Sequence, residues 1–151
     1  MYDINNMIPQ KPPMRLVDKI IGFKDETVHS QATITPTHIF FCNKTKSIPH
    51  WVAIEIMAQT TAAYGKLKTQ DCDGEASIGF LLSVRNYNTN VDSYSEKSTL
   101  DVYTECIILD NGTGVFKCKI EVDGKTTATA NINAHQPQSH DDAKKILTRS
   151  I

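Results

Sequence analysis

Hydrophobic positions are densest between Ile48 and Leu67, and the rest of the chain is organised around this stretch. Almost every position in the first dozen after Pro49 is apolar or small, and a helix that is apolar nearly all round belongs in a protein core. Ser47 suits an N-cap, Pro49 suits an early helical position that needs no amide donor, and Gly65 followed by lysines predicts the helix end. Glu55 interrupts this pattern, because a carboxylate is costly to bury unless it is paired or has a function.

Apolar residues in the remainder of the chain alternate with polar ones, a pattern typical of half-buried strands. Two such segments precede the helix and four follow it, and the turn sequences at 110–112 and 123–124 predict tight hairpins among the last three. We therefore expect an α+β fold in which a curled antiparallel sheet wraps around one long central helix, with one sheet edge paired in a dimer. The expected strands span residues 15–23, 27–35, 77–86, 99–109, 113–122 and 126–134.

The chain has 151 residues and is expected to form a single domain, residues 1–151, that is large enough to bury a core. Residues 8–14 contain three prolines, which break regular structure and predict a stiff, extended segment. The tail at 135–151 is polar, and a short helix is expected only at 141–147. The sequence thus places the core at about residues 8–134.

Charge is nearly balanced, with 16 Lys and Arg against 17 Asp and Glu, so the basic surplus of nucleic-acid binders is absent. Cys42, Cys72, Cys106 and Cys118 show no metal-ligand spacing, and we expect reduced thiols, no metal site and no cofactor. No basic N-terminal region leads into an apolar run, and no segment is long and apolar enough to cross a bilayer. These features predict a cytoplasmic protein that binds neither nucleic acid nor membrane.

Five segments follow one another in a distinctive order. They are IPQKPPMRLVDKI at 8–20, FF at 40–41, PHWVAIEIMAQ at 49–59, IGFL at 78–81 and VDGK at 122–125. Together they resemble the hot-dog beta-hydroxyacyl-(acyl carrier protein) dehydratases, whose central helix carries a Glu-Ala-Met/Leu-Ala-Gln signature. The resemblance spans residues 8–134 and looks nearest to a divergent branch of aryl-polyene-type fatty acid synthesis.

This resemblance implies a hot-dog fold and the removal of water from a beta-hydroxyacyl thioester, giving an enoyl thioester in fatty acid or polyene lipid biosynthesis. It further implies a substrate carried by acyl carrier protein or coenzyme A, and a homodimer or a hetero-oligomer with another hot-dog protein. Three family features are replaced. The catalytic loop His has its counterpart near Asn43-Lys44, the Gly at the helix start is His50, and Val91-Asp92-Ser93 stands for Pro-Gly-Asp. These departures affect the expected catalysis rather than the fold.

His50 and Glu55 are the candidate catalytic residues, because dehydration needs a base for the alpha proton and an acid for the departing hydroxyl. They lie five positions apart, about 140° around a helix, so a shared site would take one of them from a second subunit, as the resemblance implies. Trp51 and Gln59 lie four positions before and after Glu55 and share its helix face. The candidate substrate-binding residues are Trp51, Gln59, Phe41 and Phe80.

Structural roles compete with these assignments. Glu55 is alternatively a buried carboxylate that is hydrogen-bonded by backbone amides or a lysine. His50 is alternatively a residue that packs at the helix start or caps it. Gln59 is alternatively a core residue whose hydrogen bonds are satisfied. His38 lies near the same loop and is a reserve candidate for catalysis. The remaining histidines are expected at the surface: His29, His135 and His140.

Three classes of function stay open at this point. The first is a dehydratase, and the second is a hot-dog thioesterase in which the same Glu activates water against the thioester carbonyl. The third is a non-catalytic, acyl-binding hot-dog subunit that stabilises an active paralogue, which the lost loop His favours. Turnover of enoyl against acyl thioesters separates the first two. Absence of both activities, with tight association to a second hot-dog protein, indicates the third.

Overall fold

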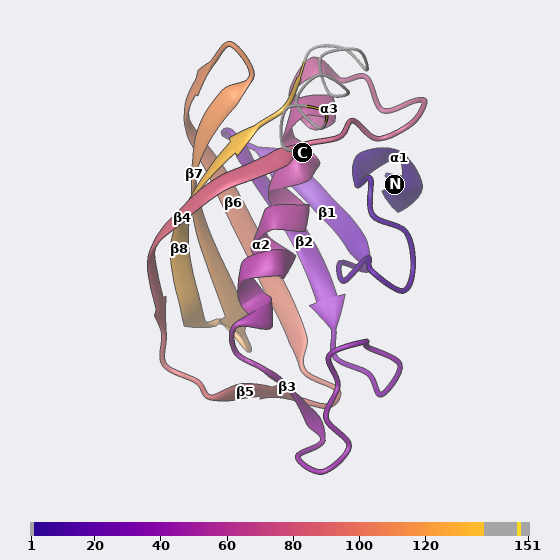
Figure 1. The fold of residues 1–151 in the computed structure, drawn as a ribbon, viewed down its shortest axis with the longest axis vertical. Helices are drawn as coiled ribbons and strands as arrows, with labels where there is room; N and C mark the ends of the chain where they lie inside the picture. The colour runs from indigo at the N-terminus through magenta and orange to yellow at the C-terminus, as the bar shows by residue number, and fades with distance from the viewer. Residues whose placement is uncertain (1, 138–147, 149–151) are drawn as a thin grey trace.

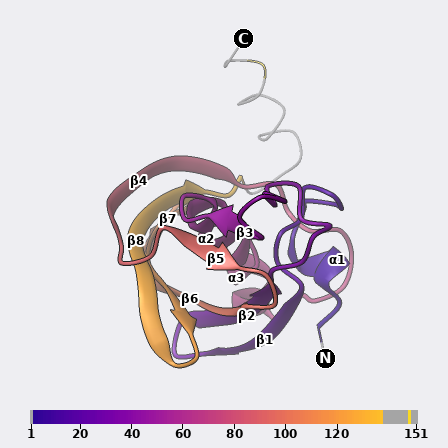
Figure 2. The same cartoon turned by 90° about the horizontal axis from the view of Figure 1, so that it is seen from below.

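The structure, a computed structural model, describes residues 2–137 and 148, and within them it contains a six-stranded antiparallel sheet. Its strands are β1 (Lys19–Lys24), β2 (Thr27–Thr33), β4 (Phe80–Thr89), β6 (Thr99–Asp110), β7 (Thr113–Val122) and β8 (Lys125–His135). Their order across the sheet is β1-β2-β6-β7-β8-β4, and the sheet curls around the central helix α2 (Val52–Ala62) (Figures 1 and 2). This arrangement confirms the expected α+β hot-dog fold with an antiparallel sheet around a central helix.

The central helix consists of two segments rather than one. After α2 the chain passes through Ala63, whose backbone is helical (φ −75°, ψ −17°), and continues as α3 (Tyr64–Thr69). The expected helix end at Gly65 is therefore wrong, because Gly65 lies inside α3. The helix ends instead at Gln70, whose left-handed backbone (φ 57°) terminates the turn.

The start of the helix also differs from expectation. Ser47 and Pro49 belong to β3 (Ser47–Pro49), which pairs with β5 (Ser93–Ser95), so neither residue caps or begins the helix. Trp51 occupies the N-cap position, and among the described residues no side chain caps the helix there. The pairing joins segments far apart in the chain. In the first helical turn, the amides of Ala53 and Ile54 donate to the carbonyls of His50 and Trp51 instead of to a capping side chain.

The hydrophobic core lies between α2 and the concave face of the sheet. Ile56 and Met57 of α2 are fully buried, and they meet fully buried aliphatic residues of the strands such as Val28, Val102 and Ile120. Each such side chain contributes on the order of 1.5–3 kcal/mol through burial. In the part of the chain that the structure describes, no helix has the length and apolar character needed to span a membrane.

The N-terminal segment packs against this core without joining the sheet. After α1 (Ile4–Met7) it is irregular until β1 begins at Lys19, so the strand expected from Arg15 starts four residues later. Leu16 and Val17 are nevertheless buried, at 5% and 1% exposure. The expected helix at 141–147 lies outside the described residues.

Candidate active site

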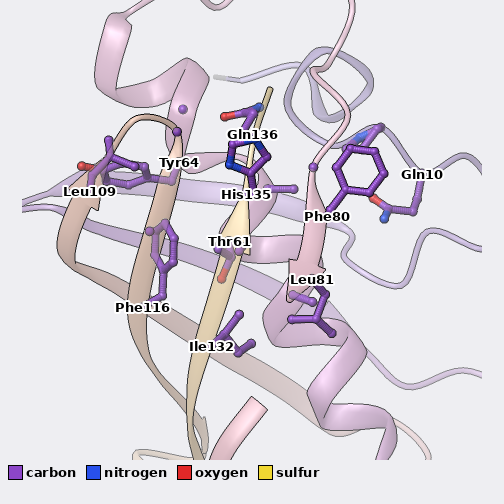
Figure 3. Close-up of a pocket in the computed structure, with 18 of the residues that line it drawn as sticks. Gln10, Thr61, Tyr64, Phe80, Leu81, Leu109, Phe116, Ile132, His135 and Gln136 are labelled. Atoms are coloured by element: carbon purple, nitrogen blue, oxygen red, sulfur yellow. The ribbon is translucent and has the colours of Figure 1, made fainter. Parts of the chain in front are cut away.

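A cavity of about 200 Å³ lies between the helices α2 and α3 and the sheet (Figure 3). Its helical wall includes Glu55, Ala58, Ala62 and Gly65, whose spacing places them on one helix face, with Thr61 and Tyr64 beside them. At 1.5 Å per residue this face is about 15 Å long. Glu55 therefore lies at one end of the wall and Gly65 at the other.

The opposite wall of the cavity is formed by the sheet and is largely apolar. The paired row Leu81, Ala134, Gly114 and Leu109 crosses β4, β8, β7 and β6, and Phe116 follows on β7. Leu81 and Leu109 are 47% and 51% exposed, so this row reaches the protein surface. The cavity is thus elongated and apolar along its sheet wall, with a carboxyl group at one end.

Gln59 holds the carboxyl group of Glu55 in place. Gln59 is fully buried, and its Nε2 donates to Glu55 Oε1 at 3.0 Å and to the Met14 carbonyl at 2.9 Å. Its Oε1 accepts from the Leu16 amide at 2.8 Å. Gln59 is not part of the cavity lining. It fixes the half-buried Glu55 against the N-terminal segment and leaves Glu55 Oε2 for a ligand.

The N-terminal segment supplies a third part of the cavity wall through Pro9 and Gln10. Gln10 Oε1 is buried, and no described residue donates a hydrogen bond to it. Buried polar atoms are normally paired, so this oxygen is an acceptor available to a donor inside the cavity. No pattern in the sequence indicates this role, because Gln10 reaches the cavity only through the folding of the segment over α2.

His50 lies just before α2 and outside the cavity lining, where Tyr87 holds it. The Tyr87 hydroxyl donates to the His50 carbonyl at 2.9 Å and lies 3.0 Å from His50 Nδ1. Since a hydroxyl carries one proton, Nδ1–H donates to the Tyr87 oxygen, and Nε2 is left as the nitrogen that accepts. Burial raises the pKa of Tyr87, so the hydroxyl keeps its proton. Within one chain His50 and Glu55 do not line the same cavity.

The aromatic candidates take different positions. Phe80 lines the cavity, where β4 pairs with β8. Trp51 is 52% exposed and packs edge-on against Phe40, with ring centroids 5.5 Å apart. Phe41 is half-buried against the core and does not line the cavity. The structure thus brings Phe80 into the cavity that Glu55 also lines but keeps Trp51 and Phe41 outside it.

His38, the reserve candidate, does not line the cavity either. Its Nδ1 accepts from the Phe40 amide at 3.2 Å, which places the proton of the neutral ring on Nε2. Burial lowers the pKa of His38, although the charge of Asp18 acts in the opposite direction. His38 is therefore a neutral ring packed in the loop before the helix. Among the residues that the structure describes, no three His, Cys, Asp or Glu side chains form a group able to hold a metal ion.

His135 is partly exposed, as expected of a surface residue, but it also lines the cavity, which was not expected. It is the last residue of β8, one position beyond the expected strand end, and it pairs with Phe80 and Thr113. Its Nδ1 lies 2.8 Å from Thr113 Oγ1. Its neighbour Gln136 also lines the cavity, and both are labelled in Figure 3. The continued alternation past Ala134 was the only local signal for this placement.

Comparison with known proteins adds a family and a fold to this geometry. A sequence model of the ApeP-like family, described as ApeP dehydratase, matches residues 2–148. A chain of the dehydratase heterocomplex ApeI:P from Xenorhabdus doucetiae is 26% identical, with a TM-score of 0.83 over 95% of this chain and 96% of that chain. A hypothetical thioesterase with coenzyme A from Streptococcus pneumoniae is 14% identical, with a TM-score of 0.59 over 78% of this chain and 86% of that chain. The E. coli PaaI protein from the phenylacetic acid degradation operon is 16% identical, with a TM-score of 0.60 over 80% and 78%. The last two likenesses show the fold alone.

Proposed function

The chain belongs to the ApeP-like dehydratase family, and we propose that Glu55 serves it in removing water from a beta-hydroxyacyl thioester. The observation that carries this proposal is the position of Glu55. It is the single acidic side chain among the described residues that line the cavity, and Gln59 orients it there. We assign the reaction to fatty acid or polyene lipid synthesis in the cytoplasm.

The shape of the cavity supports an acyl thioester as ligand. Its apolar sheet wall suits a hydrocarbon chain, since ligand sites are mostly apolar with a few placed polar groups. The thioester would lie at the Glu55 end, beside the first turn of α2. The N-terminal end of α2 has no side-chain cap at Trp51, and its positive dipole end can polarise a carbonyl oxygen. The amides of Ala53 and Ile54 themselves donate to the carbonyls of His50 and Trp51.

The reaction then needs two proton transfers. His50 Nε2 takes the alpha proton, the alpha–beta double bond forms, and the bond between the beta carbon and its hydroxyl breaks. The hydroxyl leaves as water with a proton from Glu55 Oε2, the general acid of this step. The proton on His50 returns to Glu55 through water, so the cycle is balanced. Because both residues do not line one cavity in one chain, the base comes from a second subunit.

The two edges of the sheet indicate where that subunit binds. Edge strand β1 has six residues, a bulge after Ile20 and lysines at both ends, features that protect an edge from pairing. Edge strand β4 has ten residues, and Leu81 and Leu82 on it are 47% and 57% exposed. We therefore propose that β4 pairs with another hot-dog subunit.

Pairing at β4 also determines which subunit supplies the catalytic base. Tyr87 of β4 holds His50, so a partner on this edge lies beside His50. In a homodimer the base for each Glu55 is His50 of the second copy. In a hetero-oligomer an equivalent base comes from the other hot-dog subunit, and one of the similar solved structures is itself a dehydratase heterocomplex.

The experiment that tests this function follows the hydration of trans-2-enoyl thioesters on acyl carrier protein and on coenzyme A, with acyl thioester hydrolysis measured in parallel. Hydration by the chain alone supports a homodimer. Hydration only after a second hot-dog protein is added supports the hetero-oligomer. Hydrolysis without hydration would establish the thioesterase alternative. If neither hydration nor hydrolysis occurred, with or without the second hot-dog protein, the chain would be a non-catalytic acyl-binding subunit.

A further inference from the structure

Gln136 closes the end of the cavity that lies farthest from Glu55. Its amide donates to the Gly112 carbonyl at 2.8 Å, so its backbone is fixed to the turn between β6 and β7. Its side chain reaches the helical wall, where a Cβ built on Gly65 would lie 2.1 Å from Gln136 Oε1. Figure 3 shows Gln136 beside His135 at this end of the cavity.

Two glycines make the close approach of Gln136 possible. Any side chain at Gly65 would meet the Gln136 amide. Gly112 has a φ of 80°, and a Cβ there would lie 2.5 Å from the Gln136 carbonyl oxygen. Gln136 therefore contacts the helix at Gly65 and the turn at Gly112, and it forms a wall that bridges the end of β8 and α3.

This end wall differs chemically from the sides of the cavity. The sides are lined mainly by aliphatic and aromatic residues, with Gln10 and Thr61 as polar exceptions, whereas the end presents the Gln136 amide beside the His135 ring, whose Nδ1 is occupied by Thr113. A methyl terminus pressed against these groups would remove water from them without pairing them, which is unfavourable.

We propose that Gln136 limits the length of the acyl chain that the cavity accepts, so that it selects chains that end before the Gln136–Gly65 contact. This inference rests on the proposed function, because it requires the thioester at Glu55 and the chain along the helical wall. It names Gln136 as a specificity-determining residue and Gly65 as the residue that permits its position.

The test compares the parent and Gln136→Ala on trans-2-enoyl thioesters that lengthen by two carbons at a time. Gln136→Ala is expected to raise kcat/KM for the longest chains roughly tenfold, mainly through KM, because one methylene in an apolar pocket changes discrimination by about tenfold or more. Asn133→Ala is the matched control, since Asn133 is an amide side chain three positions earlier, on β8, that does not line the cavity. It is expected to keep the length profile of the parent.

Gly65→Ala gives an independent arm. Its Cβ must displace the Gln136 amide, so we expect a changed length profile in the parent background and no further change in the Gln136→Ala background. Additive effects of the two substitutions would overturn the inference. So would identical length profiles for the parent and Gln136→Ala, while hydration by the parent would still uphold the dehydratase.

A binding measurement keeps the two proposals distinguishable. Non-hydrolysable acyl thioethers of the same lengths are titrated into the parent and Gln136→Ala. The parent's affinity is expected to fall beyond a length that Gln136→Ala still binds. If no variant hydrates any enoyl thioester, the proposed function fails, and equal binding profiles would then overturn the length limit as well.

Discussion

Gln59 Nε2 lies 3.0 Å from Glu55 Oε1, and the two residues are one helical turn apart on the same face of α2. Gln59 also binds the backbone of Met14 and Leu16, so one buried amide holds both the carboxyl group and the N-terminal segment. Gln59, a polar residue in an otherwise apolar helix, thus holds the carboxyl group of Glu55 in a fixed position.

Replacement of Gln59 by Leu is expected to destabilise the fold by about 2–4 kcal/mol. The change leaves the buried Leu16 amide and the part-buried Met14 carbonyl without their partner, and the loss of a buried hydrogen bond costs roughly 1–3 kcal/mol. Chemical denaturation measures the free energy of unfolding. Gln31→Leu is the comparison, because Gln31 makes one part-buried contact with Asp101. Equal losses for both variants would contradict the role given to Gln59.

Replacement of Tyr87 by Phe is expected to lower turnover about tenfold, because the hydroxyl fixes which nitrogen of His50 accepts a proton. Loss of a hydrogen-bond partner that orients a functional histidine typically lowers activity by about 10–100-fold. Tyr94→Phe is the matched control, because the Tyr94 hydroxyl is also hydrogen-bonded, but to Thr127 Oγ1 at 2.8 Å rather than to His50. Steady-state hydration rates measure the effect of each substitution on turnover, and thermal unfolding measures its effect on stability. A rate for Tyr87→Phe equal to that of Tyr94→Phe would remove Tyr87 from the site.

Replacement of Leu82 by Lys is expected to weaken subunit association, because charge on an edge strand opposes pairing. Leu82 lies on β4 and is 57% exposed, whereas Ile21, on the opposite edge strand β1, is 43% exposed. Sedimentation velocity of Leu82→Lys should show dissociation at concentrations where Ile21→Lys stays assembled. The reverse order would place the interface on β1.

Stability at low pH should depend on Glu26, which joins the turn between β1 and β2 to α3. Hydrogen bonds hold the pKa of Glu26 below its ordinary value of 4.5. The bond from Lys68 has the largest effect, and the bond from Tyr64 has the next largest. A lowered folded-state pKa gives stability that is present above the unfolded value and is lost as the pH falls through the folded value. Glu26→Gln should therefore lose less stability on acidification below 4.5 than the parent, as measured by denaturation at a series of pH values. Parallel curves for both proteins would contradict this.

The hydrophobic pattern was sufficient to predict the sheet and the buried helix, because burial and strand alternation are local properties of the sequence. It failed at both helix ends for one physical reason. Ser47 pairs with Ser95 in a strand, and Gly65 lies inside α3 against the Gln136 side chain rather than at a helix end. Both causes are contacts between residues far apart in the chain.

The same distinction applies to the site. Glu55 and Gln59 stand out in the sequence because they are polar positions in an apolar helix. Gln10, Tyr87 and Gln136 belong to irregular or exposed segments, and their roles arise only when the fold brings them to the cavity or to His50. Local patterns therefore predict the residue at the centre of the proposed chemistry but not the residues around it.

The most direct test of the central claim is the hydration rate of Glu55→Gln on an enoyl thioester. Gln at this position can still accept the hydrogen bond from Gln59, so the fold should be preserved, while the carboxyl proton is lost. We expect turnover to fall about a hundredfold or more. Glu105→Gln, at an exposed position of β6 outside the cavity lining, should retain the parent rate. A Glu55→Gln protein that hydrated the substrate at the parent rate would contradict the account and return Glu55 to a structural role.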